Sequence, residues 1–197
     1  MSTPEGVKSA LRRRLAAARR ALPPAVREAE AAALAATLPQ LLLLPGLPGT
    51  VCAYWPVGDE PGSAALLDGL RGSGCRVLLP VVDAPAGPLD WGEYTGAGSL
   101  RAGPFGVREP AGSRLGRAGI AGAVLVLVPA LAVDHRGVRL GRGGGYYDRT
   151  LPLATPGVGL VAVVRDDEVL PWLPAQPHDV LVSAALTPDR GLLPLPR

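Results

Sequence analysis

Residues 139–148 read RLGRGGGYYD, and four of the five residues at 141–145 are glycine. Main chain without Cβ atoms can adopt positive φ and bring its N–H groups close to phosphate oxygens. Arg139 and Arg142 flank this stretch and can add charge-assisted hydrogen bonds. The residue types and their spacing therefore favour a loop that binds phosphate groups.

The position of this glycine-rich loop supports the same interpretation. An apolar run at residues 123–128 precedes it and a helix-like stretch follows it. In α/β proteins, ligands bind beyond the carboxyl ends of the strands, and a helix N-terminus offers further donors to phosphate. No Lys-Ser/Thr pair follows the loop, so it is not a Walker A sequence. The spacing Gly141-x-Gly143-x-x-Tyr146 has tyrosine where the dinucleotide fingerprint has its third glycine, so that motif is absent as well. A flexible surface loop is the alternative, although linkers seldom carry tyrosines.

The elements that must position this loop follow from apolar runs and from proline and glycine punctuation. The predicted helices span residues 3–22, 24–43 and 63–70, and the predicted strands span residues 50–55, 76–82, 89–94, 123–128, 157–164 and 180–184. Thr3 is the expected N-cap of the first helix, and the prolines at 23 and 24 end it. Strands that alternate with helices predict an α/β fold, with residues 1–197 as one domain, a mostly parallel central sheet flanked by helices, and an N-terminal helical segment.

Composition limits the classes of function. Hydrophobic residues make up 48% of the 197 residues, which is enough for a buried core, and the net charge is only +3. That charge is too small to predict a nucleic-acid partner, and only 4% of residues are aromatic, which argues against a binding module built on the basic first helix. Cys52 and Cys75 are expected to be buried core thiols. His135 and His178 have no partner spacing and are interpreted as turn residues.

Several stretches resemble one enzyme family. Residues 129–134 (PALAVD) and 137–149 (GVRLGRGGGYYDR) are similar to the signature of 5-formyltetrahydrofolate cyclo-ligases, also called methenyltetrahydrofolate synthetases. The other stretches that agree in order are Lys8 to Arg12, Tyr54-Trp55 with Gly58-Asp59-Glu60, residues 105–110 (FGVREP) and His178-Asp179. The resemblance implies conversion of 5-formyltetrahydrofolate to 5,10-methenyltetrahydrofolate with MgATP, releasing ADP and phosphate. An ATP-binding paralogue with another substrate is the alternative.

The resemblance also implies roles for individual residues. Catalysis is assigned to Arg142 and Tyr146, and the magnesium-linked acids are Asp148 and Asp179. The ATP-binding residues are Lys8, Arg12, Arg139, Leu140, Gly141, Arg142, Gly143, Gly144, Gly145, Tyr146 and Tyr147. The folate-binding residues are Trp55, Glu60, Arg142, Gly143, Gly144, Gly145 and Tyr146, with Phe105 on the same side. One departure is Gly144, where some family members carry lysine, so the loop's charge must come from Arg139, Arg142 or Lys8.

Each assignment has a structural alternative. Lys8 and Arg12 lie four residues apart, so they share a helical face that could simply be solvated. Trp55 could be a core residue and Glu60 a turn acid. Asp148 could be an acid favoured by a helix dipole, and Asp179 could cap a loop. The remaining basic residues of the first helix, Arg13, Arg14, Arg19 and Arg20, are expected at the surface.

The expected setting is the cytoplasm, because arginines interrupt every apolar stretch near the N-terminus and no stretch is long enough to span a bilayer. The expected partners are ATP and a reduced folate, with no nucleic acid and no membrane. The chain is expected to act as a monomer.

Overall fold

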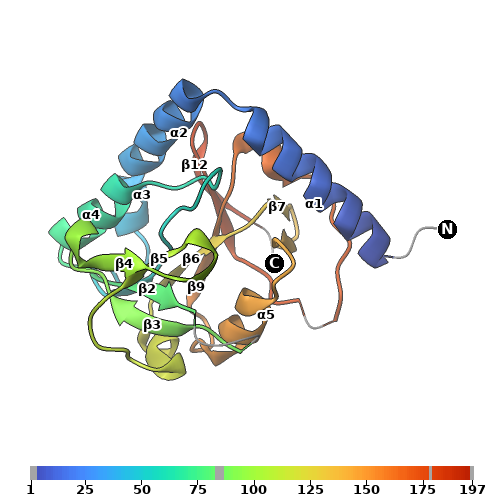
Figure 1. The fold of residues 1–197 in the computed structure, drawn as a ribbon. Coiled ribbons are helices and arrows are strands. Elements are labelled where there is room, and N and C mark those ends of the chain that lie inside the picture. The colour runs from blue at the N-terminus through green and yellow to red at the C-terminus, as the bar shows by residue number, and fades with distance from the viewer. Residues whose placement is uncertain (1–3, 83–86, 178, 196–197) are drawn as a thin grey trace.

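The structure is a computed structural model that describes residues 4–82, 87–177 and 179–195. Its centre is a large sheet crossed by helices on both faces (Figure 1). The strand order in that sheet is β12 (Gly191–Pro194), β11 (Ala184–Thr187), β9 (Gly159–Val163), β6 (Leu125–Pro129), β1 (Thr50–Cys52), β2 (Arg76–Val81) and β3 (Asp90–Glu93).

The interior of the sheet is parallel and its two edges are antiparallel. Strands β2, β1, β6, β9 and β11 pair in parallel, whereas β3 and β12 run the other way. In β6, Leu125 to Val128 are all buried, because both faces of the strand are covered. Alternate residues of the strands enter two apolar clusters, one on each face, as with Leu127 and Val128. The predicted α/β fold with a mostly parallel sheet is confirmed.

Two smaller sheets complete the strands. One has the order β10 (Val169–Leu170), β7 (Ala132–Asp134) and β8 (Arg139–Leu140), and the other pairs β4 (Leu100–Ala102) with β5 (Arg108–Pro110). The sequence analysis missed these strands and β12. They are two to four residues long, which is too short for a hydrophobic period to stand out.

The helices are α1 (Pro4–Ala21), α2 (Pro24–Ala36), α3 (Leu38–Leu42), α4 (Ala64–Gly72) and α5 (Tyr146–Thr150). Short 3₁₀ helices lie at Ala97–Ser99, Pro104–Gly106, Arg117–Gly122, Leu151–Leu153 and Asp166–Glu168. In Figure 1, α1 and α2 meet at the break near Pro23 and extend along two sides of the molecule. The predicted helix at residues 24–43 is in fact two helices. Pro39 lacks an N–H and disfavours continuous helix before it, so α2 ends and α3 begins around Thr37.

Helix α1 is tied to the sheet by a buried arginine. Arg19 is 1% exposed. Its guanidinium donates to both carboxylate oxygens of Glu168, at 2.6 and 2.7 Å, and to the carbonyl oxygen of Ala130. The prediction of a surface position was therefore wrong for Arg19, because a distant acid neutralises its charge. It holds for Arg13, Arg14 and Arg20, which are exposed.

The last predicted strand was misplaced. Strand β11 begins at Ala184, so residues 180–183 are not part of it. Instead, the Val182 N–H donates to the carbonyl oxygen of Gly137 in the turn between β7 and β8. This apolar segment therefore packs against the turn that leads into the glycine-rich loop, which a count of apolar residues could not show.

Candidate active site

The candidate site lies where the order of the large sheet reverses. The chain runs from β1 to β2 on one side, and later from β6 to β9 on the other side, while β1 and β6 are neighbours. A crevice outside the carboxyl ends of two such strands is the usual ligand site of an open α/β sheet. The segment after β1 ends in the turn of residues 57–60, named here the acidic turn. The glycine-rich loop, residues 141–145, follows β8.

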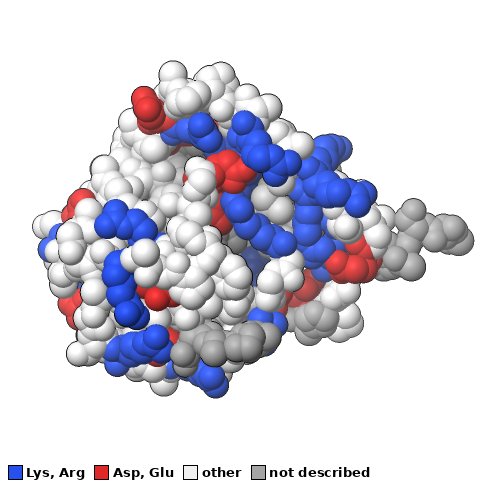
Figure 2. All heavy atoms as spheres, in the orientation of Figure 1, with Lys and Arg blue, Asp and Glu red and all other residues white. Residues whose placement is uncertain are grey.

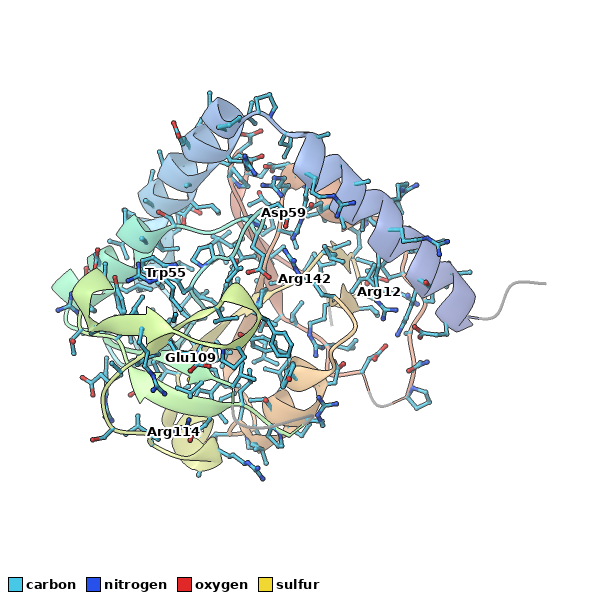
Figure 3. All side chains as sticks on the ribbon, viewed as in Figure 1. Arg12, Trp55, Asp59, Glu109, Arg114 and Arg142 are labelled. Carbon is cyan, nitrogen blue, oxygen red and sulfur yellow. The ribbon has the colours of Figure 1, made fainter. Side chains whose placement is uncertain are left out.

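The glycine-rich loop reaches the acidic turn through Arg142. The Arg142 Nη2 lies 2.7 Å from Asp59 Oδ1, and its Nε lies 3.1 Å from Glu60 Oε1. Figure 3 shows the side chains of Asp59 and Arg142 pointing toward one another. The two carboxylates are mostly buried, with side chains 14% exposed, whereas Arg142 is half exposed at 51%. The residues expected to bind phosphate and folate are therefore in direct contact.

Burial sets the electrostatics of the acidic turn. Loss of solvent raises the pKa of Glu60, and the nearby charge of Arg142 opposes that rise. The other Glu60 oxygen accepts a hydrogen bond from the Val57 N–H at 3.0 Å. Both oxygens of Glu60 are thus engaged, one by the turn itself and one by the loop.

The loop needs glycine at two positions for its backbone shape. Gly143 has φ +102° and Gly145, which precedes α5, has φ +66°. Residues with a Cβ adopt such angles only with strain. A Cβ at Gly144 would lie 3.2 Å from the Tyr146 ring, so a lysine there would require that ring to shift slightly. The missing lysine is thus compatible with the close approach of Tyr146.

Helix α1 supplies a basic wall beside the loop. Arg12 Nε donates to the carbonyl oxygen of Gly141 at 3.1 Å, and its Nη1 pairs with Glu5 at 2.6 Å. Lys8 is 6% exposed and pairs with Asp179 at 3.2 Å. Lys8 and Arg12 therefore share a face that contacts the rest of the protein rather than solvent alone. Figure 2 shows basic side chains gathered over α1 and the adjacent middle of this face, beside an acidic group.

The two predicted magnesium acids lie beside basic partners. Asp148, in the first turn of α5, pairs with Arg139, which is 7% exposed. Burial lowers the pKa of Arg139, and Asp148 and Asp179 oppose that shift. Among the described residues, no group of three His, Cys, Asp or Glu could hold a metal ion. These acids therefore fit Mg²⁺ only if phosphate oxygens and water supply the remaining ligands, as Mg²⁺ accepts in nucleotide sites.

The aromatic residues lie in different surroundings. Trp55 is partly buried against the core, with its ring centroid 6.1 Å from that of Tyr94 and with Arg108 stacked 5.2 Å above it. Phe105 is 79% exposed and has φ +57°, a strained conformation for a bulky residue. Arg149 covers the ring of Tyr146 at 5.5 Å. The Tyr147 hydroxyl is buried with no hydrogen-bond partner in the described chain.

Comparison with known proteins identifies the family. A sequence profile of the 5-formyltetrahydrofolate cyclo-ligase family matches residues 4–188. The 5-formyltetrahydrofolate cyclo-ligase of Mycolicibacterium smegmatis is 52% identical over 192 residues, which cover 95% of this chain and 97% of that protein. The chain belongs to the 5-formyltetrahydrofolate cyclo-ligase family.

Two further relatives agree. The cyclo-ligase of Escherichia coli K12 is 30% identical over 146 residues, covering 72% of this chain and 79% of that protein. The NMR structure of Aquifex aeolicus 5,10-methenyltetrahydrofolate synthetase superimposes with a TM-score of 0.78 at 26% identity, covering 97% of this chain and 94% of that one. The similarity to the family therefore extends to the whole fold.

The structure brings some of the predicted residues together and leaves others apart. Arg142 and Glu60 touch, and Arg12 touches the glycine-rich loop at Gly141. Lys8, Asp179, Arg139 and Asp148 form two ion pairs beside them. Among the described residues, Trp55 and Phe105 make no hydrogen bond, ion pair or ring contact with the loop, and Trp55 packs against the core beside Tyr94. His135 lies in the turn before β8, as predicted, and His178 lies outside the described residues.

Sequence reasoning missed the buried charges that support this site in the cyclo-ligase fold. Arg165, which is 5% exposed, donates from Nη1 to the carbonyl oxygen of Asp59 at 3.2 Å and holds both oxygens of Glu30 on α2 at 2.8 and 3.0 Å. The main-chain N–H of Arg165 donates to the side chain of Glu168, which is also the partner of Arg19. In three of these contacts, Arg165 with Glu30, Arg165 with Asp59 and Arg19 with Glu168, the two residues are more than one hundred positions apart in the chain. A pattern of local spacing therefore could not predict these contacts.

A cavity of about 300 Å³ opens next to the acidic turn. It is lined by the first half of α2, by Arg165, and by Pro56, Gly58, Glu60, Pro61 and Gly62. A second cavity of about 280 Å³ also has Arg165 in its lining, together with the end of α1 and Asp166–Glu168. The first cavity therefore provides open space beside the carboxylate of Glu60, to which the family resemblance assigns folate binding.

Proposed function

We propose that this protein converts 5-formyltetrahydrofolate to 5,10-methenyltetrahydrofolate with ATP. Family membership supports the reaction class, and one observation from the structure supports the arrangement. The glycine-rich loop carries the residue types that bind phosphates. Its Arg142 contacts the carboxylate of Glu60, which is the kind of group that binds a pterin. One site can therefore hold a nucleotide and a folate next to one another.

The formyl group requires activation before the ring can close. An N-formyl carbon is amide-like and a poor electrophile. In the proposed reaction the formyl oxygen attacks the γ-phosphorus of ATP, ADP leaves, and an iminium phosphate forms. N10 then attacks the activated carbon and gives up its proton to solvent, and inorganic phosphate leaves with the former formyl oxygen.

The residues of this chain support that sequence by position and charge. Main-chain N–H groups at residues 141–145, with Arg12 and Lys8, would bind the phosphate chain. Arg142 would stabilise the charge on the transferring phosphoryl group, which is the main catalytic device in such reactions. Glu60 would accept hydrogen bonds from the amino and amide donors of the pterin. Tyr146 would border the transfer site, since it follows the loop directly.

Asp148 and Asp179 would hold Mg²⁺ together with phosphate oxygens. Bound there, Mg²⁺ would neutralise phosphate charge and favour in-line transfer. Because Asp148 pairs with Arg139 and Asp179 pairs with Lys8, each carboxylate would have to bind the metal ion in addition to, or in place of, its basic partner.

The proposed setting is the cytoplasm, with a monomer acting on small molecules and with no nucleic-acid or membrane partner. The small net charge of +3 supports the absence of a nucleic-acid partner. Within the described residues, no helix has the length and apolar character to cross a membrane.

An absorbance assay tests the proposed function. Purified protein with 5-formyltetrahydrofolate, ATP and Mg²⁺ should develop the near-ultraviolet absorbance of the methenyl product, and omission of ATP should abolish it. Arg142→Ala should lose this activity with little change in Tm. Arg14→Ala, which removes an exposed arginine from the other side of α1, should retain it. Folded wild-type protein that gives no product would favour the paralogue with another substrate.

A further inference from the structure

Arg142 forms a bridge between the two proposed substrate sites, and Asp59 is the nearer of its two carboxylate partners. The bridge consists of Arg142, Asp59 and Glu60, with N–O distances of 2.7 Å to Asp59 and 3.1 Å to Glu60. Arg142 is the residue proposed to meet the phosphoryl group and Glu60 the residue proposed to meet the pterin. Asp59 has no assigned role.

We propose that Asp59 is a positioning residue that, together with Glu60, retains Arg142 on the acidic turn until substrate binds, so that the two substrates bind with positive coupling. This inference rests on the proposed function for the identity of the two substrates. It concerns the order and strength of binding, which the reaction itself does not specify.

The acidic turn is the fixed side of the bridge. Arg165 donates to the carbonyl oxygen of Asp59 at 3.2 Å, and Arg165 itself is buried and paired with Glu30. The Glu60 N–H donates to the Val57 carbonyl at 3.1 Å, and the Val57 N–H donates back to the Glu60 side chain. The turn is therefore held by main-chain and buried charged contacts that do not involve Arg142.

Arg142 is the movable side. Its side chain is half exposed, and Gly141 and Gly143 are its neighbours in the chain. Glycine gives the backbone conformational freedom on both sides. When the bridge opens, we therefore expect Arg142 to move and the acidic turn to stay in place.

Charge explains why each substrate would open the bridge. One guanidinium faces two carboxylates, so a triphosphate competes for Arg142 with more negative charge than the turn provides. When Arg142 departs, Glu60 Oε1 loses its partner in a mostly desolvated position, and a pterin amino or amide group can take that place. A folate that binds Glu60 first would likewise displace the Arg142 Nε.

Coupling follows because both substrates require the open bridge. The first substrate to bind breaks the ion pairs of Arg142 with Asp59 and Glu60, and the second substrate then binds without having to break them. Each substrate should raise the affinity for the other by the same factor, since coupling between two sites is reciprocal. Weakening the bridge should tighten the binding of either substrate alone and reduce the coupling factor.

The test is calorimetry on wild type and Asp59→Asn with a non-hydrolysable ATP analogue plus Mg²⁺ and with 5-formyltetrahydrofolate, each alone and in the presence of the other. Wild type should show reciprocal tightening. In Asp59→Asn, each ligand alone should bind about two- to fivefold more tightly, as expected for loss of a partly exposed ion pair, and affinity in the ternary complex should stay unchanged. Asp59→Glu, which keeps the charge, should behave more like wild type.

Asp189→Asn is the matched control, because it removes the same charge from an exposed side chain that has no ion pair with Arg142 and no hydrogen bond to Asp59 or Glu60. It should leave all affinities as in wild type. Weaker binding in Asp59→Asn, or wild-type coupling in that variant, would overturn the positioning role. If wild type forms the methenyl product but shows no coupling, the bridge proposal fails alone. If wild type forms no product, the proposed function fails instead.

Discussion

At the scale of single residues, buried polar groups in this protein differ in whether they have a partner. The Tyr54 hydroxyl donates to the Pro61 carbonyl, which connects the start of the segment after β1 to the residue that follows the acidic turn. The Tyr147 hydroxyl lies buried without a partner among the described residues, although its ring packs against the core. A buried hydroxyl without a hydrogen bond is destabilising, whereas a paired one contributes modestly to stability.

Replacement of Tyr147 by phenylalanine tests that difference. We expect Tyr147→Phe to leave the free energy of unfolding unchanged or to raise it by about 1 kcal/mol, because it removes an unsatisfied polar atom. Tyr54→Phe is the comparison and should lower it by about 1 kcal/mol or more, because the Pro61 carbonyl loses its donor. Urea unfolding measures both. A substantial loss of stability in Tyr147→Phe would show that its hydroxyl has a partner.

At the scale of elements, two connections hold the segments of the candidate site against the rest of the protein. The Arg19–Glu168 pair fixes α1, which carries Lys8 and Arg12. The turn between β7 and β8 is fixed at Gly137, where the carbonyl oxygen accepts from Val182. Both connections join segments far apart in the sequence, so each can be tested by substitutions on one of its two sides.

The buried pair on α1 gives an asymmetric prediction. Arg19→Ala should lower the free energy of unfolding by about 3 kcal/mol, because the buried Glu168 loses its bidentate partner and keeps only Arg165, whose Nη1 lies 3.8 Å away. The double variant Arg19→Met, Glu168→Leu should recover part of that loss, since the buried carboxylate is gone and the Arg165 guanidinium still pairs with Glu30 at 2.8 Å. Chemical denaturation of the three proteins measures the effect. Equal losses in the single and double variants would contradict this account.

Gly137 gives a second prediction at this scale. It has φ +84°, and a Cβ there would clash with the carbonyl oxygen of Val182. Gly116 has a similar φ of +79° but open space around it. Gly116→Ala should therefore cost about 1 kcal/mol from backbone strain, and Gly137→Ala clearly more, because the backbone itself must move. Thermal unfolding compares them, and similar Tm values would contradict the role of the close approach.

At the scale of the whole molecule, the core keeps several weak acids neutral. Burial raises the pKa of Cys52 and of Tyr94 to about 12 each, with the Asp68 hydrogen bond adding to the shift at Tyr94. Burial also raises the pKa of Tyr54 and Tyr147. In the unfolded chain these groups ionise near their ordinary values of roughly 8.5 for a thiol and 10 for a phenol.

Stability should therefore fall at alkaline pH. Above the ordinary pKa values the folded state binds more protons than the unfolded state, so the free energy of unfolding decreases as pH rises. The contribution is complete below about pH 8.5 and is lost progressively toward the folded pKa values. Each such group lowers stability by up to about 1.4 kcal/mol per pH unit in that window. Urea unfolding from pH 8 upward measures the slope, and Tyr94→Phe should make it shallower above about pH 10. A flat profile would contradict the shifts.

How much could be predicted from sequence differs between parts of the site. Local chain chemistry shows the glycine-rich loop, because only glycine provides its backbone freedom and because arginine, tyrosine and aspartate stand beside it. The continuous apolar run of β6 likewise indicates a strand covered on both faces. The partner of Arg19, the support of Asp59 by Arg165, and the close approach of Gly137 to Val182 involve residues far apart in the chain.

The sequence by itself therefore determined the fold class, the loop and the family, since these depend on residue types at short spacing. Only the tertiary structure decided which charges are buried and which are exposed, and that Arg142 rests on Asp59 and Glu60. The physical reason is that the energy of a charge depends on the solvent and partners around it, and folding brings those partners from distant positions.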